Sequence, residues 1–386
     1  MEAKSLKSNK LIAIIYPWLN LYGGGEVFLE YCNNLLLKKY NTELYFYNNN
    51  KKIHKKIRFN KKTKFISVRS KNYFINFLCC KFMIFAQAYL IYFFNKYNKK
   101  NYKIVYSASG EFFSKFKTIQ YIHIFIFFIN IFEFKNFGLS SIFKKIGRLI
   151  AAVLCRIALG INKKKFKNVY TLTNSKWSLQ RLSKTYDIKY KKVLYPTFKI
   201  PKFQKMSLKK FNNRKNNFVI LGRVTEDKNI LEAIIFFNSI KNQIRNAQLH
   251  IIGPIDKNYL KKIKLEIKDK KKIYFHGLVS LRRRDYLLKN SKYGLNFFNS
   301  EHFGRGTLEM QKLGMIVFAK NAGGVKEILL SKIQKFENHI DLNNNVLKTH
   351  FNDKVKQNIL TKNAKKFKFS LTDRQFSKNF ISNFSS

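Results

Sequence analysis

The segment 301–309 carries the most informative side chains of this sequence, because two carboxylates flank a glycine-rich turn. It reads EHFGRGTLE, and we expect Glu301 to lie on a loop and Glu309 about one turn into the helix that follows. The first amides of a helix have no acceptor within that helix, and the helix dipole favours phosphate there. A carboxylate accepts several hydrogen bonds from hydroxyl groups. The segment therefore suits a ligand that joins phosphate to sugars, such as a nucleotide sugar.

A second candidate for phosphate binding is the segment 222–229, which reads GRVTEDKN and follows an apolar run. Ligands of open parallel sheets bind beyond the carboxyl ends of the strands, which is where this segment is expected. Arg223 offers a planar fork and Lys228 a point charge, and together they suit a diphosphate. In a chain so rich in lysine each could also be an ordinary solvated charge. Their combination with the segment 301–309 favours the binding interpretation.

Two further features near the N-terminal half are weaker signals. Three consecutive glycines at 23–25 let the backbone approach a phosphate or sugar closely, but for an isolated triplet a plain tight turn is the preferred explanation. Their spacing is not that of the dinucleotide motif GxGxxG. His123 ends a candidate strand, and a lone histidine in apolar surroundings is more often structural than catalytic.

Motifs for metals and for two common enzyme classes do not occur in the sequence. It has no HExxH, CxxC or Asp-x-Asp pattern, so we expect no bound metal and no cofactor. It has no Walker A motif and no GxSxG, which argues against an NTPase and against a hydrolase of that type. Four cysteines show no disulfide framework, which is typical of a reducing compartment.

The elements that must position these residues follow a strand-turn-helix pattern that starts twice. The first start is an apolar strand at 11–16 with a helix over 27–39, and the second is a strand at 218–222 with a helix over 230–242. Strands that alternate with helices imply an α/β fold with parallel sheets. Further strands are expected at 44–47, 104–107, 119–124, 170–173, 249–253, 273–275, 293–297 and 316–319, and further helices at 259–267 and 284–290.

The length of 386 residues suits two domains. The basic, polar stretch 199–217 is the natural linker. We therefore predict an N-terminal domain over 10–198 and a C-terminal domain over 199–345. The Lys- and Asn-rich tail, 346–386, is predicted to form helices that pack back on the outside.

The formal net charge of +55 predicts attraction to anionic partners. A genome rich in A and T would also produce this abundance of Lys, Asn, Ile, Phe and Tyr. Nucleic-acid binding is an alternative that rests on the charge alone, because no RNP-like motif or basic region is visible and no specific nucleic acid is expected. The stretch 141–165 mixes apolar and basic residues, as does an amphipathic helix on an anionic membrane surface. An ordinary core helix with a basic solvated face is the alternative.

No stretch of the sequence is a clean membrane span. The stretch 73–95 comes closest, but Asn76, Lys81 and Gln87 interrupt it. The stretch 123–136, dense in Phe and Ile, also looks membrane-facing. The sequence thus predicts a cytoplasmic protein that is peripheral on the membrane face.

These segments together resemble the retaining glycosyltransferases of family 4, which have the GT-B architecture of two Rossmann-like domains around a cleft. The resemblance spans nearly the whole chain, and its most specific part is the pair Glu301 and Glu309 with seven residues between them. It rests on GGGE at 23–26, GR at 222–223, KN at 228–229, FHG at 275–277, the segment 301–309, and GG at 323–324 with Glu327.

Within that family, several details resemble the α-1,2-mannosyltransferases that extend lipid-linked oligosaccharide from GDP-mannose. The chain departs from this subgroup in its run of three early glycines rather than four, and in Arg305, where the residue is often apolar. The details are GGGE at 23–26, YIH at 121–123, TNSKWS at 173–178, VLYP at 193–196 and EHFG at 301–304.

The resemblance implies a role for each site residue of the C-terminal domain. Arg223 and Lys228 would hold the diphosphate and neutralise the charge of the leaving group. Glu309 would bind the ribose and Glu301 the transferred hexose, and the loop 277–279 would border the nucleobase. The complete set implied to bind the donor there is Arg223, Lys228, Gly277, Val279, Glu301, Phe303, Gly304, Gly306, Thr307, Leu308 and Glu309.

From the N-terminal domain, His123 would approach the reacting sugar, and the backbone of Gly24 and Gly25 the leaving phosphate. His123, Arg223, Lys228 and Glu301 would then be the catalytic residues. The implied partners are a nucleotide sugar, an anionic membrane surface and a lipid-linked or cell-envelope glycan acceptor. A UDP-sugar transferase and a nucleotide-sugar epimerase of the same fold are alternatives.

Overall fold

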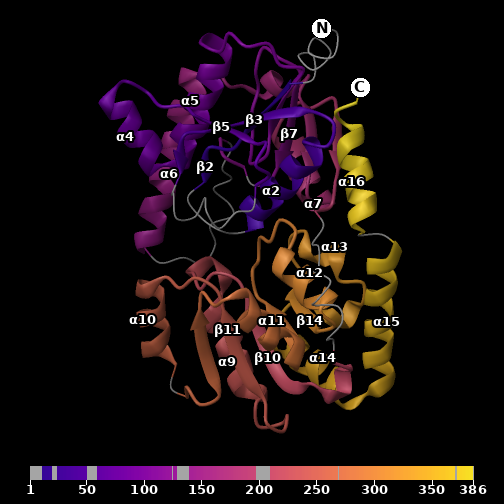
Figure 1. The fold of residues 1–386 in the computed structure, drawn as a ribbon. Coiled ribbons are helices and arrows are strands. Elements are labelled where there is room, and N and C mark those ends of the chain that lie inside the picture. The colour runs from indigo at the N-terminus through magenta and orange to yellow at the C-terminus, as the bar shows by residue number, and fades with distance from the viewer. Residues whose placement is uncertain are drawn as a thin grey trace. The chain divides into compact units, whose positions relative to one another are not determined.

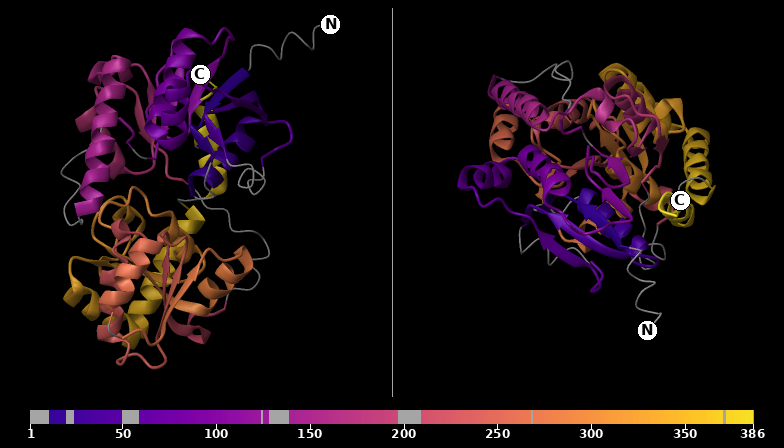
Figure 2. Two further views of the ribbon diagram at one scale, coloured as in Figure 1. Left: turned by 90° about the vertical axis from the view of Figure 1, so that its left-hand side faces the viewer. Right: turned by 90° about the horizontal axis from the view of Figure 1, so that it is seen from above.

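The computed structural model divides the chain into two compact units, Met1–Pro196 with Phe376–Ser386, and Thr197–Gln375. Each unit is built on a parallel sheet, so the predicted α/β class with two such domains is confirmed (Figure 1). Figure 2 shows the strands of each unit flanked by helices. The structure describes residues 11–19, 24–49, 59–123, 125–127, 139–196, 209–267, 269–369 and 372–385.

The sheet of the N-terminal unit has seven strands in the order β5-β3-β1-β6-β7-β8-β9. The apolar run that starts at residue 11 forms β1 inside this sheet, and its residues 12 to 15 are fully buried. Such burial is typical of a parallel strand covered on both faces. The strands are β1 (Leu11–Ile15), β3 (Asn41–Phe46), β5 (Lys64–Ser67), β6 (Ile104–Ser107), β7 (Thr118–Ile122), β8 (Tyr170–Thr173) and β9 (Lys191–Val193), with β2 (Trp18–Leu19) and β4 (Asn48–Asn49) in a separate pair.

Alternate residues of β1 pack into two different cores, one on each face of the sheet. Ile12 and Ile14 share a core with Phe28 of the first helix. Ala13 and Ile15 share the other core with residues of later helices, among them Leu90 and Leu182. The helices are α2 (Gly24–Leu36), α4 (Tyr73–Lys81), α5 (Met83–Lys96), α6 (Leu139–Ala158), η3 (Lys163–Phe166) and α7 (Lys176–Thr185).

The sheet of the C-terminal unit has six strands in the order β12-β11-β10-β13-β14-β15. Its neighbours are all parallel, and β10 lies between β11 and β13. The strand order therefore reverses between β10 and β13. The strands are β10 (Lys215–Leu221), β11 (Gln248–Ile252), β12 (Ile273–Gly277), β13 (Ser291–Asn296), β14 (Ile316–Lys320) and β15 (Lys335–Phe336).

Helices of the C-terminal unit share one large apolar core with its strands. Phe218 of β10 lies in this core against Phe237, with ring centroids 5.9 Å apart. The helices are α9 (Ile230–Ile240), α10 (Lys257–Glu266), α11 (Leu281–Asn290), α12 (Arg305–Lys312), α13 (Val325–Ile328), α14 (His339–Phe351) and α15 (Asp353–Phe369), with short turns η4 (Phe211–Asn213), η5 (Glu226–Lys228) and η6 (Lys332–Gln334).

The last helix, α16 (Asp373–Ser382), returns the chain to the N-terminal unit (Figure 1). Phe376 and Phe380 are buried in the same core as Phe28. The hydroxyl of Tyr40 also donates to the carbonyl of Phe384 at 2.9 Å. The stretch 346–386, predicted as one tail, is therefore shared between the two units.

Most predicted elements coincide with observed ones to within a few residues. β6 and β8 have the predicted bounds, and α9 begins where predicted, at residue 230. The sequence analysis missed β5, β9 and β15, which have two to four residues. β9 reads KKV and has two exposed lysines, so it lacks the apolar pattern of a buried strand.

Candidate active site

The residues predicted to bind a phosphate lie beside the point where the strand order of the C-terminal sheet reverses. The loop after β10 carries Arg223 and Lys228, and the loop after the neighbouring strand β13 carries Glu301. A crevice at the carboxyl ends of strands, at such a reversal, is where open α/β sheets bind ligands. The topology therefore brings these two predicted loops together.

Arg223 stands on a loop whose backbone is fixed to the neighbouring strand end. The amide of Gly222 donates to the carbonyl of Ile252 at 3.0 Å. A Cβ on Gly253 would lie 1.9 Å from the carbonyl oxygen of Gly222, so only glycine permits this approach. The Arg223 side chain is 61% exposed and lies 4.0 Å from the carboxylate of Asp227. Its guanidinium is thus available to an anion in solution.

Lys228 contacts two groups from the loop after β13. Its Nζ lies 3.4 Å from Oε2 of Glu301 and 3.5 Å from the centroid of the Phe298 ring. The next residue, Asn229, has a left-handed backbone with φ of 50° and donates through Nδ2 to the carbonyl of Phe297 at 3.0 Å. The predicted diphosphate cation and the predicted hexose-binding carboxylate therefore meet. A bound diphosphate would compete with Glu301 for the ammonium group.

The backbone of Glu301 is held by the loop after β14. The amide of Gly324 donates to the carbonyl of Glu301 at 2.6 Å. Gly323 has φ of +68°, and a Cβ there would lie 2.3 Å from the same carbonyl oxygen. Gly323 thus permits the close approach, and the amide of Gly324 fixes the carbonyl of Glu301.

Helix α12 begins beside this pair. Its N-cap, Gly304, has φ of 89°, and a Cβ on Gly306 would lie 2.8 Å from the carbonyl oxygen of Leu221. The amide of Leu308 donates to the carbonyl of Gly304 at 2.9 Å, so it is used within the helix. The amides of Gly306 and Thr307 come earlier in the first turn and have no acceptor inside α12. An anion at this helix end would therefore bind those two amides rather than that of Leu308.

Glu309 is buried on α12 and faces a cation that the sequence analysis did not single out. Its Oε1 lies 2.8 Å from the guanidinium of Arg284 on α11, which is also 3.3 Å from Asp285. Burial raises the pKa of Glu309, while Arg284 and Arg305 act to lower it. Arg284 carries no signal of its own, because it lies in the basic run 282–284 of a basic chain.

Gly277, Val279 and Phe303 are the remaining residues of this unit that are predicted to bind the donor. Gly277 ends β12 with φ of +65° and accepts from the amide of Gly253 at 3.0 Å. Val279 is half-buried. Phe303 is buried at 2% exposure, so its ring belongs to the interior.

In the N-terminal unit, His123 follows the carboxyl end of β7, and Gly24 and Gly25 begin helix α2. His123 follows β7 and packs edge-on against Phe28 of α2, with ring centroids 4.9 Å apart. Gly24 begins the same helix. A Cβ on Gly25 would lie 2.6 Å from the hydroxyl of Tyr16, so an added side chain would collide there. The structure thus places His123, Gly24 and Gly25 on neighbouring elements.

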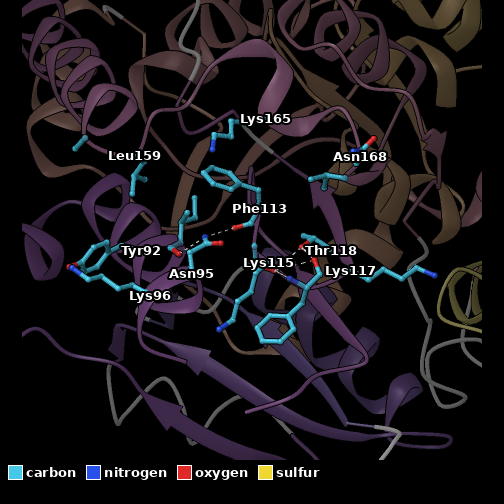
Figure 3. A pocket seen from close by; sticks show the side chains of 15 residues that line it. Tyr92, Asn95, Lys96, Phe113, Lys115, Lys117, Thr118, Leu159, Lys165 and Asn168 are labelled. Carbon is cyan, nitrogen blue, oxygen red and sulfur yellow. Dashed lines mark hydrogen bonds between the residues drawn. The ribbon is translucent and has the colours of Figure 1, made fainter. Parts of the chain in front are cut away.

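A cavity of about 770 Å³ lies at the opposite edge of this sheet (Figure 3). It is lined by the starts of β7 and β8, including Thr118 and Val169, and by Phe113 and Lys165. Asn95 donates to the carbonyl of Phe113 at its rim. Because the cavity is at the amino ends of the strands, it is separate from the edge that carries His123.

No group of three or more His, Cys, Asp or Glu residues that could hold a metal occurs among the residues that the structure describes. The expectation of no metal therefore stays a prediction.

A family model described as Glycosyl transferases group 1 matches residues 202–367. The matched residues lie within the C-terminal unit. This span contains every predicted donor-binding residue of that unit. No curated protein matches the chain by sequence.

Solved structures match nearly the whole chain at low identity. HepE from Anabaena, in complex with UDP and glucose, has a TM-score of 0.66 at 13% identity, over 97% of this chain and 99% of that one. Sucrose-phosphate synthase from Thermosynechococcus elongatus has a TM-score of 0.69 at 12% identity, over 97% and 98%. WaaG, a glycosyltransferase involved in lipopolysaccharide biosynthesis, has a TM-score of 0.66 at 12% identity, over 97% and 100%. These matches show that the fold is GT-B.

Proposed function

We propose that this protein is a retaining glycosyltransferase that moves a hexose from a nucleotide sugar to a glycan acceptor. The observation that carries the proposal is the meeting of Lys228 and Glu301 beside the N-terminus of α12. One place thus offers a cation and two helix amides for a diphosphate, and a carboxylate for sugar hydroxyls. The group 1 domain over the same residues supports the assignment.

In the proposed reaction, the C-terminal unit holds the leaving group. Arg223, Lys228 and the amides of Gly306 and Thr307 stabilise the diphosphate as its negative charge develops. Glu309 binds the ribose and Glu301 the hexose. In the retaining mechanism the acceptor attacks from the face of the leaving group, and a phosphate oxygen takes the acceptor proton. This mechanism requires no second carboxylate as a general base.

Two further roles in the proposed reaction fall to the N-terminal unit. His123 contacts the hexose, and the backbone of Gly24 and Gly25 contacts the leaving phosphate. The packing of His123 on α2, the helix that begins at Gly24, supports a shared role.

For the donor, we propose GDP-mannose, because motifs throughout the chain resemble the α-1,2-mannosyltransferases. A UDP-sugar is the second candidate, because the structure of HepE contains UDP and glucose. Competition between GDP and UDP for the purified protein separates the two.

For the acceptor, we propose a lipid-linked or cell-envelope glycan at an anionic membrane surface. Helix α6 supports this, because its exposed apolar residues recur at the spacing of one helical face. Within the described residues, no helix is long and apolar enough to span a bilayer. The exposed fractions on α6 are 47% for Ile146, 53% for Ile150, 40% for Val153, 55% for Leu154 and 73% for Ile157.

Helix α4 supports the same surface. Tyr73, Phe74 and Phe77 are 86%, 66% and 47% exposed, and only Cys79 is buried on this helix. Exposed aromatic clusters mark interaction surfaces, and aromatic rings favour the membrane interface. Of the predicted membrane-facing stretch 123–136, only 123 and 125–127 lie within the described residues.

The proposal is tested by thermal stabilisation with nucleotides and nucleotide sugars. A donor at about 100 times its dissociation constant adds about 2.7 kcal/mol to the stability of the folded state. Lys228→Ala should abolish that shift and the transfer of hexose, while Lys262→Ala should keep both. Lys262 is the matched control: it lies on α10, and its Nζ is 3.6 Å from the carboxylate of Glu226, which belongs to the same loop as Lys228.

Two alternative outcomes have distinct signatures in these assays. An epimerase would convert the donor sugar without any acceptor, whereas a transferase requires one. Salt-dependent RNA binding with no nucleotide-sugar affinity would favour the nucleic-acid alternative.

A further inference from the structure

A buried carboxylate holds the backbone just beyond His123. Glu111, in the loop between β6 and β7, is fully buried. Its Oε2 accepts from the amide of Ile126 at 2.7 Å, and its Oε1 accepts from the amide of Phe127 at 3.3 Å. The hydroxyl of Tyr186 donates to the same Oε1 at 2.6 Å. Three donors from two separate segments thus converge on one side chain.

The same stretch of backbone is held at its other end by a cation. Arg148 of α6 donates through its guanidinium to the carbonyl of Phe125 at 3.3 Å. The guanidinium of Arg181 lies 6.0 Å from the centroid of the Phe125 ring. Burial lowers the pKa of Arg148, and the charge of Glu111 opposes that shift. The charge of Glu111 therefore favours the protonated guanidinium that donates to the loop.

Burying an acid is costly, which argues that this arrangement has a purpose. Burial raises the pKa of Glu111, and the hydrogen bonds from Tyr186 and the backbone amides act against the rise. A buried carboxylate without such partners would cost several kcal/mol. Ile126 and Phe127 are themselves only 1% exposed, so their amides cannot bond to water and Glu111 is the acceptor that fixes them.

We propose that Glu111 and Arg148 are positioning residues for His123. They fix the backbone of 125–127, so that the imidazole two residues earlier is presented at the carboxyl edge of the sheet. We name this pair the 125–127 clamp. The inference rests on the proposed function of His123 at the transferred hexose. It adds that Arg148 links the loop after His123 to α6, the helix that carries the exposed apolar residues Ile146 to Ile157.

Glu111→Gln tests the clamp with little change in shape. The amide nitrogen of glutamine donates, so it cannot replace both carboxylate oxygens opposite Ile126, Phe127 and Tyr186. Displacement of a reacting group by about 1 Å costs about 10²-fold in rate. We expect kcat of Glu111→Gln to fall about 10- to 100-fold per folded molecule. The KM for the donor should change less than about twofold, because the C-terminal unit holds the diphosphate.

A double-mutant cycle separates positioning from general destabilisation. In a His123→Ala background, Glu111→Gln should lower kcat no further, because its effect acts through the imidazole. Arg148→Lys should retain more kcat than Arg148→Ala, since only the lysine can still reach the carbonyl of Phe125. If Glu111→Gln does not fold, Tyr186→Phe takes its place in the cycle, because it removes one hydrogen-bond donor to the carboxylate of Glu111.

Glu43 provides the matched control in the same unit. It lies in β3 and is buried at 5% exposure. Its carboxylate accepts hydrogen bonds from Lys100 at 2.8 Å and from Tyr102 at 2.5 Å. Glu43→Gln should lower the melting temperature and leave kcat unchanged.

Three outcomes would count against these ideas, and they differ. Wild-type kcat in folded Glu111→Gln and Arg148→Ala overturns the clamp alone. An equal loss of kcat from Glu111→Gln with and without His123 overturns its action through the imidazole. Wild-type kcat in His123→Ala overturns the proposed role of His123 itself.

Discussion

Gly323 offers a sharp test of whether the backbone of Glu301 must be held in place. The φ of +68° disfavours any residue with a Cβ, at about 1–2 kcal/mol. An added Cβ would also lie 2.3 Å from the carbonyl oxygen of Glu301, against about 3.4 Å for ordinary contact. The added Cβ is fixed to the backbone, and the carbonyl oxygen of Glu301 belongs to it. The loop that carries Gly323 or the loop that carries Glu301 must therefore move by about 1 Å. We expect Gly323→Ala to displace Glu301 from the sugar.

The size of the effect follows from that displacement. A shift of about 1 Å in a reacting constellation costs about 10²-fold in kcat, or about 2.7 kcal/mol of transition-state stabilisation. The conformational cost should lower the melting temperature by about 2–8 °C. Steady-state transfer with radiolabelled or mass-tagged donor measures the first quantity, and calorimetry the second.

Gly160 is the matched control for the backbone cost. Its φ is +58°, and a Cβ there meets nothing within 4 Å. Gly160→Ala should therefore lower the melting temperature without changing kcat. If Gly323→Ala were as active as Gly160→Ala at full folding, the reasoning that links this loop to Glu301 would be refuted.

Three further predictions concern the donor, the membrane and acid stability. Glu309→Gln should raise the donor KM about 10- to 100-fold, because hydrogen bonds to charged groups contribute about 1.5–3 kcal/mol; competition by free nucleotide measures it. Ile150→Ser with Ile157→Ser should weaken binding to vesicles that contain phosphatidylglycerol, measured by sedimentation, while transfer to a soluble acceptor analogue stays unchanged. The pKa of Glu43 is lowered to about 2 from a usual value of 4.5, although burial alone would raise it, because Lys100 and Tyr102 donate to the carboxylate. The folded-state pKa is the lower one, so this stabilisation is present above about pH 4.5 and is lost as the pH falls toward 2; Glu43→Gln should remove that part of the acid dependence of the melting temperature.

Residues of the candidate site could be predicted where the residue type is rare in this chain, as acids are, or where glycines mark an unusual backbone conformation. Glu301 and Glu309 were identified from their spacing, and Gly323 and Gly324 from their place in the motif. Arg284 could not be identified, because cations occur throughout this chain and only tertiary structure shows which one faces Glu309.

The fold was predictable where strands are buried and apolar. β1 and β10 are continuous apolar runs, and their positions follow from that pattern. The return of α16 to the N-terminal unit was not predictable in detail, because its apolar residues are widely spaced phenylalanines in a Lys- and Asn-rich tail. Which unit those rings cover depends on the chain's tertiary path.

The composition bias changes which residues carry information. With 76 Lys and Arg against 21 Asp and Glu, a lysine near any site is expected by chance, whereas a buried acid is not. Within the described residues, the buried acids include Glu309 at the predicted site and Glu26 beside the early glycines. A third, Glu111, holds the loop after His123. Buried acids are therefore a better guide to function than cations in such a chain, although Glu43 is a buried acid to which we assign a structural role. Neutralising Glu111 or Glu309 should impair transfer far more often than neutralising lysines chosen at the same distance from the two sheet edges, and a scan of both residue types would measure the difference.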